Sequence, residues 1–168
     1  TNPSSRGNGV TYNMWLVFDS NQPNGHSLLF GGSTSNHLEW RGSVTTGYWR
    51  TEAVRQNGYS FGASATSYGR HEIGKWFNLC IVFANNESGR PVRWYHNGVL
   101  FHTGDMTSGN FASSEYFQPS SFGRATGTSA YLYSQSFNGR MGVFSTYMKT
   151  LTQKQITQNY NVYKNRFL

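Results

Sequence analysis

The segment from Trp40 to Arg50 gathers the side chains best suited to bind a sugar. The candidates in and after it are Trp40, Tyr48, Trp49, Arg50, Tyr59 and Tyr68. An aromatic ring can stack on the apolar face of a pyranose, while a guanidinium donates hydrogen bonds to its hydroxyls. We therefore predict glycan contacts at these six residues. For Trp40 and Trp49 the alternative is that the large rings fill the core.

The spacing of the acidic residues does not favour glycoside hydrolysis. A glycosidase places two carboxyl groups about 5–10 Å apart across the bond that it cleaves. The seven acidic residues are Asp19, Glu39, Glu52, Glu72, Glu87, Asp105 and Glu115, and no two lie within nine positions of each other. No Gly-x-Ser-x-Gly motif occurs either. We predict no catalytic residues and no enzymatic activity.

Oxygen ligands for calcium are sparse. A calcium site takes about six to eight oxygen ligands, with carboxylates among them. Asp19, close to Asn21 and Asn24, could supply one carboxylate, and Asp105 could supply another. Both residues also fit the alternative of turn residues at strand ends. We predict no metal and no other cofactor, with calcium as the lesser alternative.

Histidine and cysteine do not form a transition-metal pattern. His96 and His102 are close in sequence, but the hairpin between them would place them on opposite faces of a sheet. We expect the other three histidines, which lie in turn-rich sequence, to be exposed: His26, His37 and His71. Cys80 lies inside an apolar run and is predicted to be a buried structural thiol.

Composition bounds the fold and the partners. The chain has 168 residues, a net charge of +7, only 12% charged residues and 17% aromatic residues, which excludes disorder through excess charge. No two Lys or Arg residues are adjacent, so we predict no specific binding to nucleic acid. No stretch approaches the roughly 18 apolar residues of a membrane-spanning helix, so we predict no membrane partner.

Short segments rich in β-branched and aromatic residues alternate with turn residues along the chain. This pattern is typical of an all-β sandwich or barrel, and of the two we predict an antiparallel β-sandwich. The expected strands are Val10 to Asp19, Ser27 to Phe30, His37 to Arg41, Gly47 to Val54, Ser60 to Gly62, Trp76 to Ala84, Val92 to His96, Val99 to Thr103, Ala130 to Tyr133 and Gly139 to Tyr147. The segment from Ser108 to Thr128 is predicted to be a loop, because it is rich in Asn, Gly, Ser and Pro.

Asn97 and Gly98 predict a two-residue hairpin turn, since both central positions of a type I′ turn need a positive φ. The resulting register opposes His96 to Val99, Trp94 to Phe101 and Arg93 to His102. One face would then carry the core residues Val92, Trp94, Val99 and Phe101. The other face would carry Arg93, Tyr95, Leu100 and His102.

A short C-terminal helix is predicted after Thr152. Thr152 and Gln155 form the pattern of a capping box. Ile156, Tyr160 and Tyr163 then fall on one stripe, which should pack against the sandwich.

Three ordered segments resemble a known family. They run from Gly74 to Ala84, from Val92 to Phe101 and from Phe137 to Ile156. They are similar to the laminin G-like jelly rolls of the concanavalin A-like lectin/glucanase superfamily, in which a Trp opens a core strand, a strand ends in an Asn-Gly turn, and Leu-Thr-x-x-x-Ile leads into a short helix. The resemblance implies a jelly roll over residues 10–168, preceded by a polar arm at residues 1–9.

One departure from the family concerns the strand starting at Val10. The family usually has a strand upstream, whereas nine polar residues precede Val10 here. Either the chain was cut from a longer protein, or a neighbouring chain covers this sheet edge, because uncovered edges invite pairing. We predict a contact there.

The Leu-Thr-x-x-Gln-Ile-x-x-Asn-Tyr-Asn ending, from Leu151 to Asn161, resembles domains on tailed-phage virion proteins. The resemblance implies a non-enzymatic structural or adhesive virion surface protein, a head-decoration or fibre component, which is homo-oligomeric, contacts other virion proteins and binds cell-surface glycans. The alternative is a carbohydrate-binding, lectin-like module of a secreted or cell-surface protein, located outside the cell.

Overall fold

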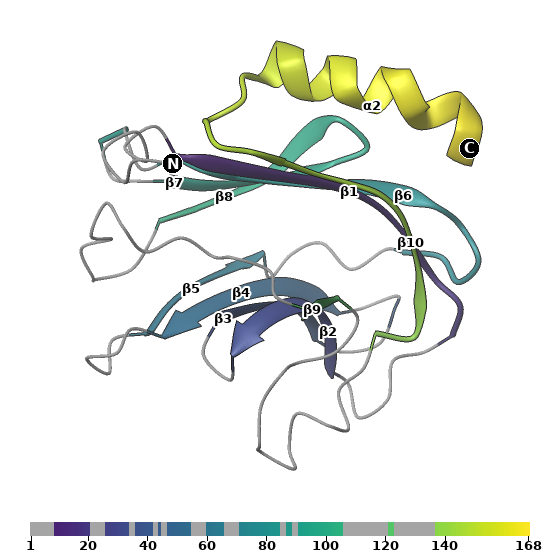
Figure 1. Cartoon of the computed structure of the whole chain (residues 1–168), viewed down its shortest axis with the longest axis horizontal. Helices are drawn as coiled ribbons and strands as arrows, with labels where there is room; N and C mark the ends of the chain where they lie inside the picture. Colours follow the sequence, from purple (N-terminus) through teal and green to yellow (C-terminus); the bar gives the residue numbers. More distant parts are fainter. Residues whose placement is uncertain are drawn as a thin grey trace.

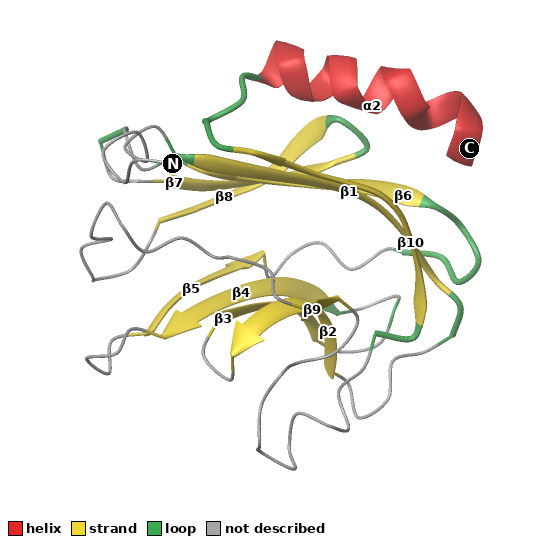
Figure 2. Ribbon diagram, viewed as in Figure 1, coloured by secondary structure: helices red, strands yellow, loops and turns green. Residues whose placement is uncertain are grey.

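The computed structural model is a sandwich of two five-stranded antiparallel sheets with one described helix (Figures 1 and 2). It describes residues 9–20, 26–33, 36–41, 44, 47–54, 60–65, 71–84, 87–88, 91–105, 121–122 and 137–168. The first sheet has the order β10 (Gly139–Tyr147), β1 (Val10–Phe18), β6 (Phe77–Phe83), β7 (Pro91–His96) and β8 (Val99–Asp105). The second has the order β5 (Ser60–Ala65), β4 (Tyr48–Val54), β3 (Asn36–Arg41), β2 (His26–Ser33) and β9 (Ser121–Phe122).

Nine of the ten predicted strands are confirmed, with ends that differ by a few residues. The tenth, from Ala130 to Tyr133, lies outside the described residues. The predicted loop from Ser108 to Thr128 is wrong at β9, because Phe30 and Gly31 of β2 pair with Phe122 and Ser121. A two-residue strand has no periodicity of its own, so its sequence carries no strand signal.

The prediction of an uncovered edge at β1 is wrong. β1 pairs with β10 on one side and with β6 on the other, so it lies inside the first sheet. β10 therefore covers the edge of β1 that was expected to be open. Residues 1–8 of the predicted polar arm lie outside the described residues.

The core lies between the sheets, and a second apolar layer lies between the first sheet and the helix α2 (Gln153–Phe167). β6 is buried along its whole length because it is covered on both faces. Leu79 and Ile81 face the core, whereas Cys80 and Val82 face the helix. Cys80 is buried, as predicted.

A β-bulge corrects the predicted register of the β7–β8 hairpin. His96 pairs with Val99 as expected, but the register shifts between Trp94 and Tyr95. Trp94 therefore pairs with His102, and Arg93 pairs with Thr103, each one residue further along β8 than predicted. The prediction that His96 and His102 lie on opposite faces assumed the regular register, and it stays a prediction.

The two faces of the hairpin largely follow the prediction. Val92, Trp94 and Phe101 pack in the core. Tyr95 packs on the other face, under the helix. Val99 is a correction, because it is 67% exposed at the tip of the hairpin, beside the turn.

α2 begins with the predicted capping box and lies across the outer face of the first sheet (Figure 1). Gln155 N–H donates to Thr152 Oγ1 at 3.3 Å, and Thr152 N–H donates to Gln155 Oε1 at 3.0 Å. Ile156 is fully buried, and Tyr160 stacks on Trp15 of β1 with ring centroids 5.6 Å apart. In the described part of the chain, no helix is long and apolar enough to cross a membrane.

Candidate functional site

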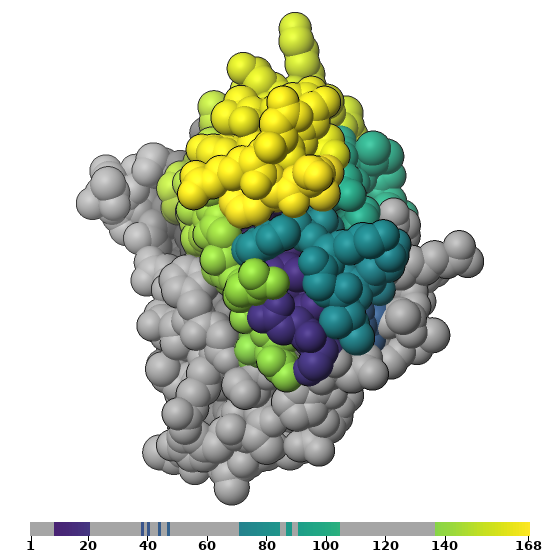
Figure 3. Space-filling model, turned by 90° about the vertical axis from the view of Figure 1, so that its right-hand side faces the viewer, coloured from purple at the N-terminus to yellow at the C-terminus, as the bar shows by residue number. Residues whose placement is uncertain are grey.

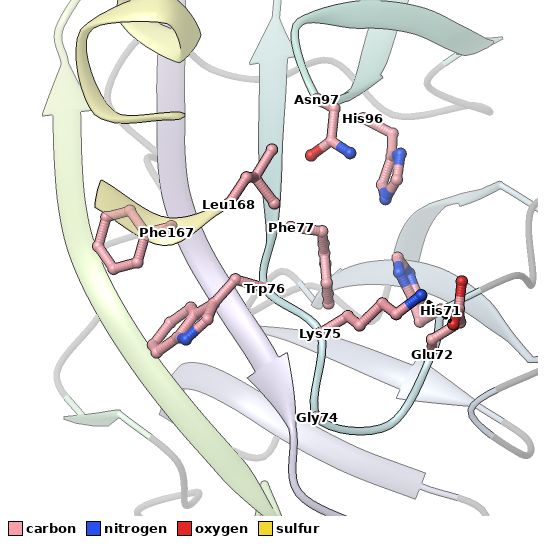
Figure 4. A pocket seen from close by; sticks show the side chains of 10 residues that line it. All are labelled: His71, Glu72, Gly74, Lys75, Trp76, Phe77, His96, Asn97, Phe167 and Leu168. Carbon is pink, nitrogen blue, oxygen red and sulfur yellow. Dashed lines mark ion pairs between the residues drawn. The ribbon is translucent and has the colours of Figure 1, made fainter. Parts of the chain in front are cut away.

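A pocket of about 460 Å³ opens at the end of the sandwich where the chain terminates (Figures 3 and 4). We call it the end pocket. Its walls come from the segment before β6, the tip of the β7–β8 hairpin and the last turn of α2. It is lined by His71, Glu72, Gly74, Lys75, Trp76, Phe77, His96, Asn97, Phe167 and Leu168. Three segments far apart in sequence therefore meet at one site.

Two imidazoles and a phenyl ring form the inner wall of the end pocket. His71 stacks on Phe77 with centroids 3.8 Å apart, and His96 stacks on Phe77 at 5.5 Å. His71 also meets the edge of Trp40 at 4.8 Å, which ties this wall to the core. His71 is only 2% exposed, so the prediction that it is an exposed turn residue is wrong.

Burial keeps both imidazoles neutral. Desolvation, and then the neighbouring charge of His96, lower the pKa of His71 to about 2. Desolvation alone lowers the pKa of His96 to about 4. At neutral pH each ring therefore carries one donor and one acceptor nitrogen and no charge.

The turn residue Asn97 is fixed by hydrogen bonds to Asn78 of β6. Its Oδ1 accepts from Asn78 N–H at 2.8 Å, and its own N–H donates to Asn78 O at 2.9 Å. The Asn78 side chain in turn donates to Asn13 Oδ1 and to Met14 O. Asn97 has φ 51° and Gly98 has φ 78°, which is the conformation predicted for this turn. These bonds hold the Asn97 side chain at the upper rim of the pocket (Figure 4).

The lower rim carries an exposed ion pair. Lys75 Nζ lies 2.5 Å from Glu72 Oε2, and the two side chains are 69% and 66% exposed. Gly74 between them has φ 81°, a backbone conformation that L side chains rarely adopt, so the turn depends on glycine. The rim thus presents a cation and an anion to solvent at the pocket mouth (Figure 4).

Trp76 and Phe167 form an aromatic outer wall with a guanidinium at each end. The two rings lie 4.8 Å apart, and Phe167 also stacks on Trp15 at 4.7 Å. Arg140 lies over Trp76 at 5.6 Å, and Arg166 lies over Phe167 at the same distance. We call these four residues the Arg–aromatic row.

Several carboxylates with described side chains are engaged by cations. Asp19 accepts from Arg140 through its Nε and Nη2, at 2.8–3.2 Å. This pairing turns one of the two predicted calcium ligands into the partner of a guanidinium. Glu87 pairs with Arg93, whose hydrogen bond lowers the pKa of the Glu87 carboxyl. Within the described ranges, no group of three or more His, Cys, Asp and Glu is placed to hold a metal ion.

Of the six candidates predicted from sequence, Trp40 is the one whose side chain the structure describes, and it does not line the end pocket. Trp40 is fully buried in the core, where it contacts Phe18 at 5.4 Å, so its ring offers no face to a sugar. Tyr48, Trp49 and Arg50 lie on β4, with Trp49 opposite Trp40 in the register. Tyr59 and Tyr68 lie outside the described residues. For these five residues the predicted glycan contacts stay a prediction.

Sequence reasoning missed the end pocket, although part of its signal was present. Gly74-Lys-Trp-Phe77 was recognised only as the start of a core strand. Phe167 continues the stripe of Ile156, Tyr160 and Tyr163 by another helical step, and that spacing could have placed it against the sheet. His71 had no such signal, because its burial depends on contacts with distant residues.

Comparison with solved structures supports the same architecture. A putative carbohydrate-binding protein from Bacteroides ovatus is similar over 90% of this chain and 40% of its own, with a TM-score of 0.63 and 15% identity. The SAP-like pentraxin of Limulus polyphemus has a TM-score of 0.58 and 12% identity, over 89% of this chain and 68% of its own. The receptor-binding domain of botulinum neurotoxin type G has a TM-score of 0.61 and 12% identity, over 92% and 38%.

The chain spans well under half the length of two of these three structures. No curated protein sequence matches it. A family model described as the concanavalin A-like lectin/glucanases superfamily matches residues 1–157. The match confirms the resemblance seen in the sequence and agrees with the observed sandwich. The chain belongs to the concanavalin A-like lectin/glucanase superfamily.

Proposed function

We propose that this chain is a carbohydrate-binding module that holds a glycan at the end pocket without cleaving it. The observation that carries the proposal is the make-up of that pocket. The pocket has a volume of about 460 Å³, and it is lined by aromatic rings, neutral imidazoles, one fixed amide and one exposed ion pair. That volume falls within the range of small-molecule sites, roughly 300–1,000 Å³. The printed description of the Bacteroides ovatus structure, a putative carbohydrate-binding protein of the same fold, supports the same class of ligand.

The chemistry of the pocket suits sugar hydroxyls. Each hydroxyl is both donor and acceptor, so it matches neutral imidazole and amide groups, which also offer both. Trp76 and Phe167, which are half-buried, supply apolar walls for the C–H faces of a pyranose. The Glu72–Lys75 pair is exposed, so a ligand can exchange hydrogen bonds with it at little desolvation cost.

Binding without hydrolysis is supported by the state of the carboxylates. A glycosidase needs one carboxyl group whose pKa is raised, so that it can donate a proton. Glu87 has a lowered pKa instead, because Arg93 stabilises its charged form. Asp19 is bonded to Arg140, and Glu72 to Lys75. These pairings leave each of the three carboxylates with a described side chain bonded to a cation.

A glycan array with the purified chain, followed by titration of the retained sugars, tests the proposal. The test variant is Glu72→Ala/Lys75→Ala, which removes the rim ion pair without changing net charge. The matched control is Glu87→Ala/Arg93→Ala, which removes another ion pair at the opposite end of β6. We expect the first variant to lose affinity and the second to retain it. Equal binding by both variants, or no sugar retained by the native chain, would reject the end pocket as the site.

We further propose that the module is an adhesive surface component of a larger assembly. The sequence favours a virion as this assembly, and the alternative is the extracellular face of a cell. Large apolar side chains exposed to solvent, among them Val162, Met148 and Leu168, support an assembly surface. Light scattering on a sizing column tests this second role. A salt-resistant homo-oligomer favours the virion component, whereas a monomer with sugar affinity favours the free lectin-like module.

A further inference from the structure

We infer that the glycan bound at the end pocket is anionic, a polysaccharide carrying carboxylate or sulfate groups. This inference rests on the proposed function and names its ligand class. It comes from the charges gathered around the pocket mouth and from how the structure holds them. The same end of the molecule presents the last turn of α2, the segment before β6 and the start of β10 (Figure 3).

Among the described side chains at this end of the molecule, cations outnumber anions. Lys75 lies on the rim, Arg140 lies over Trp76, and the last turn of α2 carries Lys164 and Arg166. Against these four side chains stand two carboxylates, Asp19 and Glu72, each already paired with one of the cations. The balance is therefore positive, in line with the net charge of +7 of the whole chain.

Of these four cations, Lys164 and Arg166 are the two that are not paired with a carboxylate of a described residue. Among the residues that the structure describes, neither forms an ion pair. Both lie at the helix C-terminus, one turn or less from Phe167 and Leu168, which line the pocket. An acidic group on a bound sugar would supply the partner that the chain itself does not.

The Arg–aromatic row places the guanidiniums where a stacked or edge-on sugar could meet them. Arg140 and Arg166 each lie 5.6 Å from a ring centroid, and the two rings lie side by side. Arg166 is exposed at the outer end of the row. Arg140 already donates to Asp19, whereas the planar guanidinium of Arg166 can donate two parallel hydrogen bonds to a carboxylate or sulfate, which favours acidic over neutral sugars.

The inner wall does not add to the positive charge at neutral pH. His71 and His96 are neutral there, since burial lowers both pKa values. Acidic groups are therefore expected to bind at the rim and the Arg–aromatic row, while sugar hydroxyls meet the half-buried side chains of His96 and Asn97. The charged groups of the ligand and its uncharged hydroxyls are thus expected to bind at different parts of the pocket.

Three dextran-based probes and one further polymer separate the possible results. The probes are neutral dextran, carboxymethyl dextran and dextran sulfate, and single-stranded DNA serves as a polyanion without acidic sugars. Binding of the full chain is measured by affinity electrophoresis and by titration at low and physiological salt. The test variant is Arg166→Gln, and the matched control is Lys154→Gln, twelve residues earlier on the same helix and about 18 Å away.

We expect carboxymethyl dextran or dextran sulfate to bind more tightly than neutral dextran. Arg166→Gln should weaken that binding about fivefold at low salt, and Lys154→Gln by less than twofold. Lys75→Gln, on a different element, should act in the same direction as Arg166→Gln.

Each contrary result has one meaning. Equal binding of neutral and acidic dextrans would overturn the anionic ligand while leaving the carbohydrate-binding module in place. Binding of DNA as tight as that of dextran sulfate, or equal losses in Arg166→Gln and Lys154→Gln, would overturn it by showing attraction to any polyanion. No binding to any dextran would overturn the proposed function together with the inference.

Discussion

His71 and His96 lie with their ring centroids 5.2 Å apart on the inner wall of the end pocket, although they come from different elements. Both rings stack on Phe77, which lies at the start of β6. Protonation of either imidazole would place a charge next to the other ring and among aromatic side chains. The pocket wall is therefore built to be stable only while both rings are neutral.

The stability of the fold should fall as pH is lowered from 7 to 5. Both pKa values are lowered in the folded state, to about 2 for His71 and about 4 for His96, against 6.5 for each in an unfolded chain. In this window the unfolded state binds more protons, so the free energy of unfolding decreases as the pH is lowered from 7 to 5, by about 3–4 kcal/mol for two such groups. Urea denaturation at a series of pH values measures it.

His71→Phe provides the control for this pH dependence. It keeps a ring stacked on Phe77 but removes one titrating group, so about half of the loss between pH 7 and 5 should disappear. Glu87 also favours the folded state through its lowered pKa, but that contribution is lost only below the ordinary pKa of 4.5. A native chain equally stable at pH 7 and pH 5 would show that the imidazoles are not buried as described.

Asn97→Ala should destabilise the chain by about 2 kcal/mol, and Asn97→Gly by about 1 kcal/mol. Both substitutions remove the hydrogen bond to Asn78 N–H, but only alanine also strains the backbone at φ 51°. Thermal unfolding measures both. If alanine and glycine have the same effect, the turn does not hold Asn97 in the left-handed region.

Gly142→Ala should disturb the last turn of α2. A Cβ at this position would lie 2.6 Å from Cζ of Phe167, which stacks on Trp15 and contacts Trp76 at a tilt. We expect a shift of the tryptophan fluorescence and a loss of roughly 1–3 kcal/mol. In Phe167→Ala, which removes the obstructing ring, adding Gly142→Ala should cost much less. Additive effects of the two substitutions would contradict the contact.

The Cys80 thiol should not react with a thiol reagent in the native state at neutral pH. It is buried between the first sheet and α2, and burial raises the pKa of the thiol, so almost no thiolate is present. Colorimetric titration should find no free thiol in the native chain and one per chain in denaturant. Fast reaction of the native chain would mean that α2 opens away from the sheet.

Local patterns were enough to predict most of the fold. The apolar run at β6 predicted a strand, and Asn97-Gly98 predicted the turn of the β7–β8 hairpin. Thr152 with Gln155 predicted the start of α2. Each of these signals acts between residues that are close in sequence. The register of β8 escaped prediction because a bulge depends on packing across the sheet rather than on a local motif.

The candidate site could not be predicted in the same way. Trp40 was expected to contact a sugar, yet it packs in the core beside Phe18 and His71. An aromatic residue on a strand has the same local pattern whether its ring faces a ligand or the opposite sheet. The end pocket joins His71, Asn97 and Phe167 from three separate segments, and only the tertiary fold brings them together.

The measurement that tests the central claim most directly is a two-dimensional ¹H–¹⁵N NMR titration of the labelled chain with an oligosaccharide that it retains. The account predicts shifts of the Trp76 indole N–H, of the Asn97 side-chain amide and of the backbone around Lys75, with Lys154 unchanged. Shifts confined to Tyr48, Trp49 and Arg50, or no shift at saturating sugar, would contradict the end pocket as the glycan site.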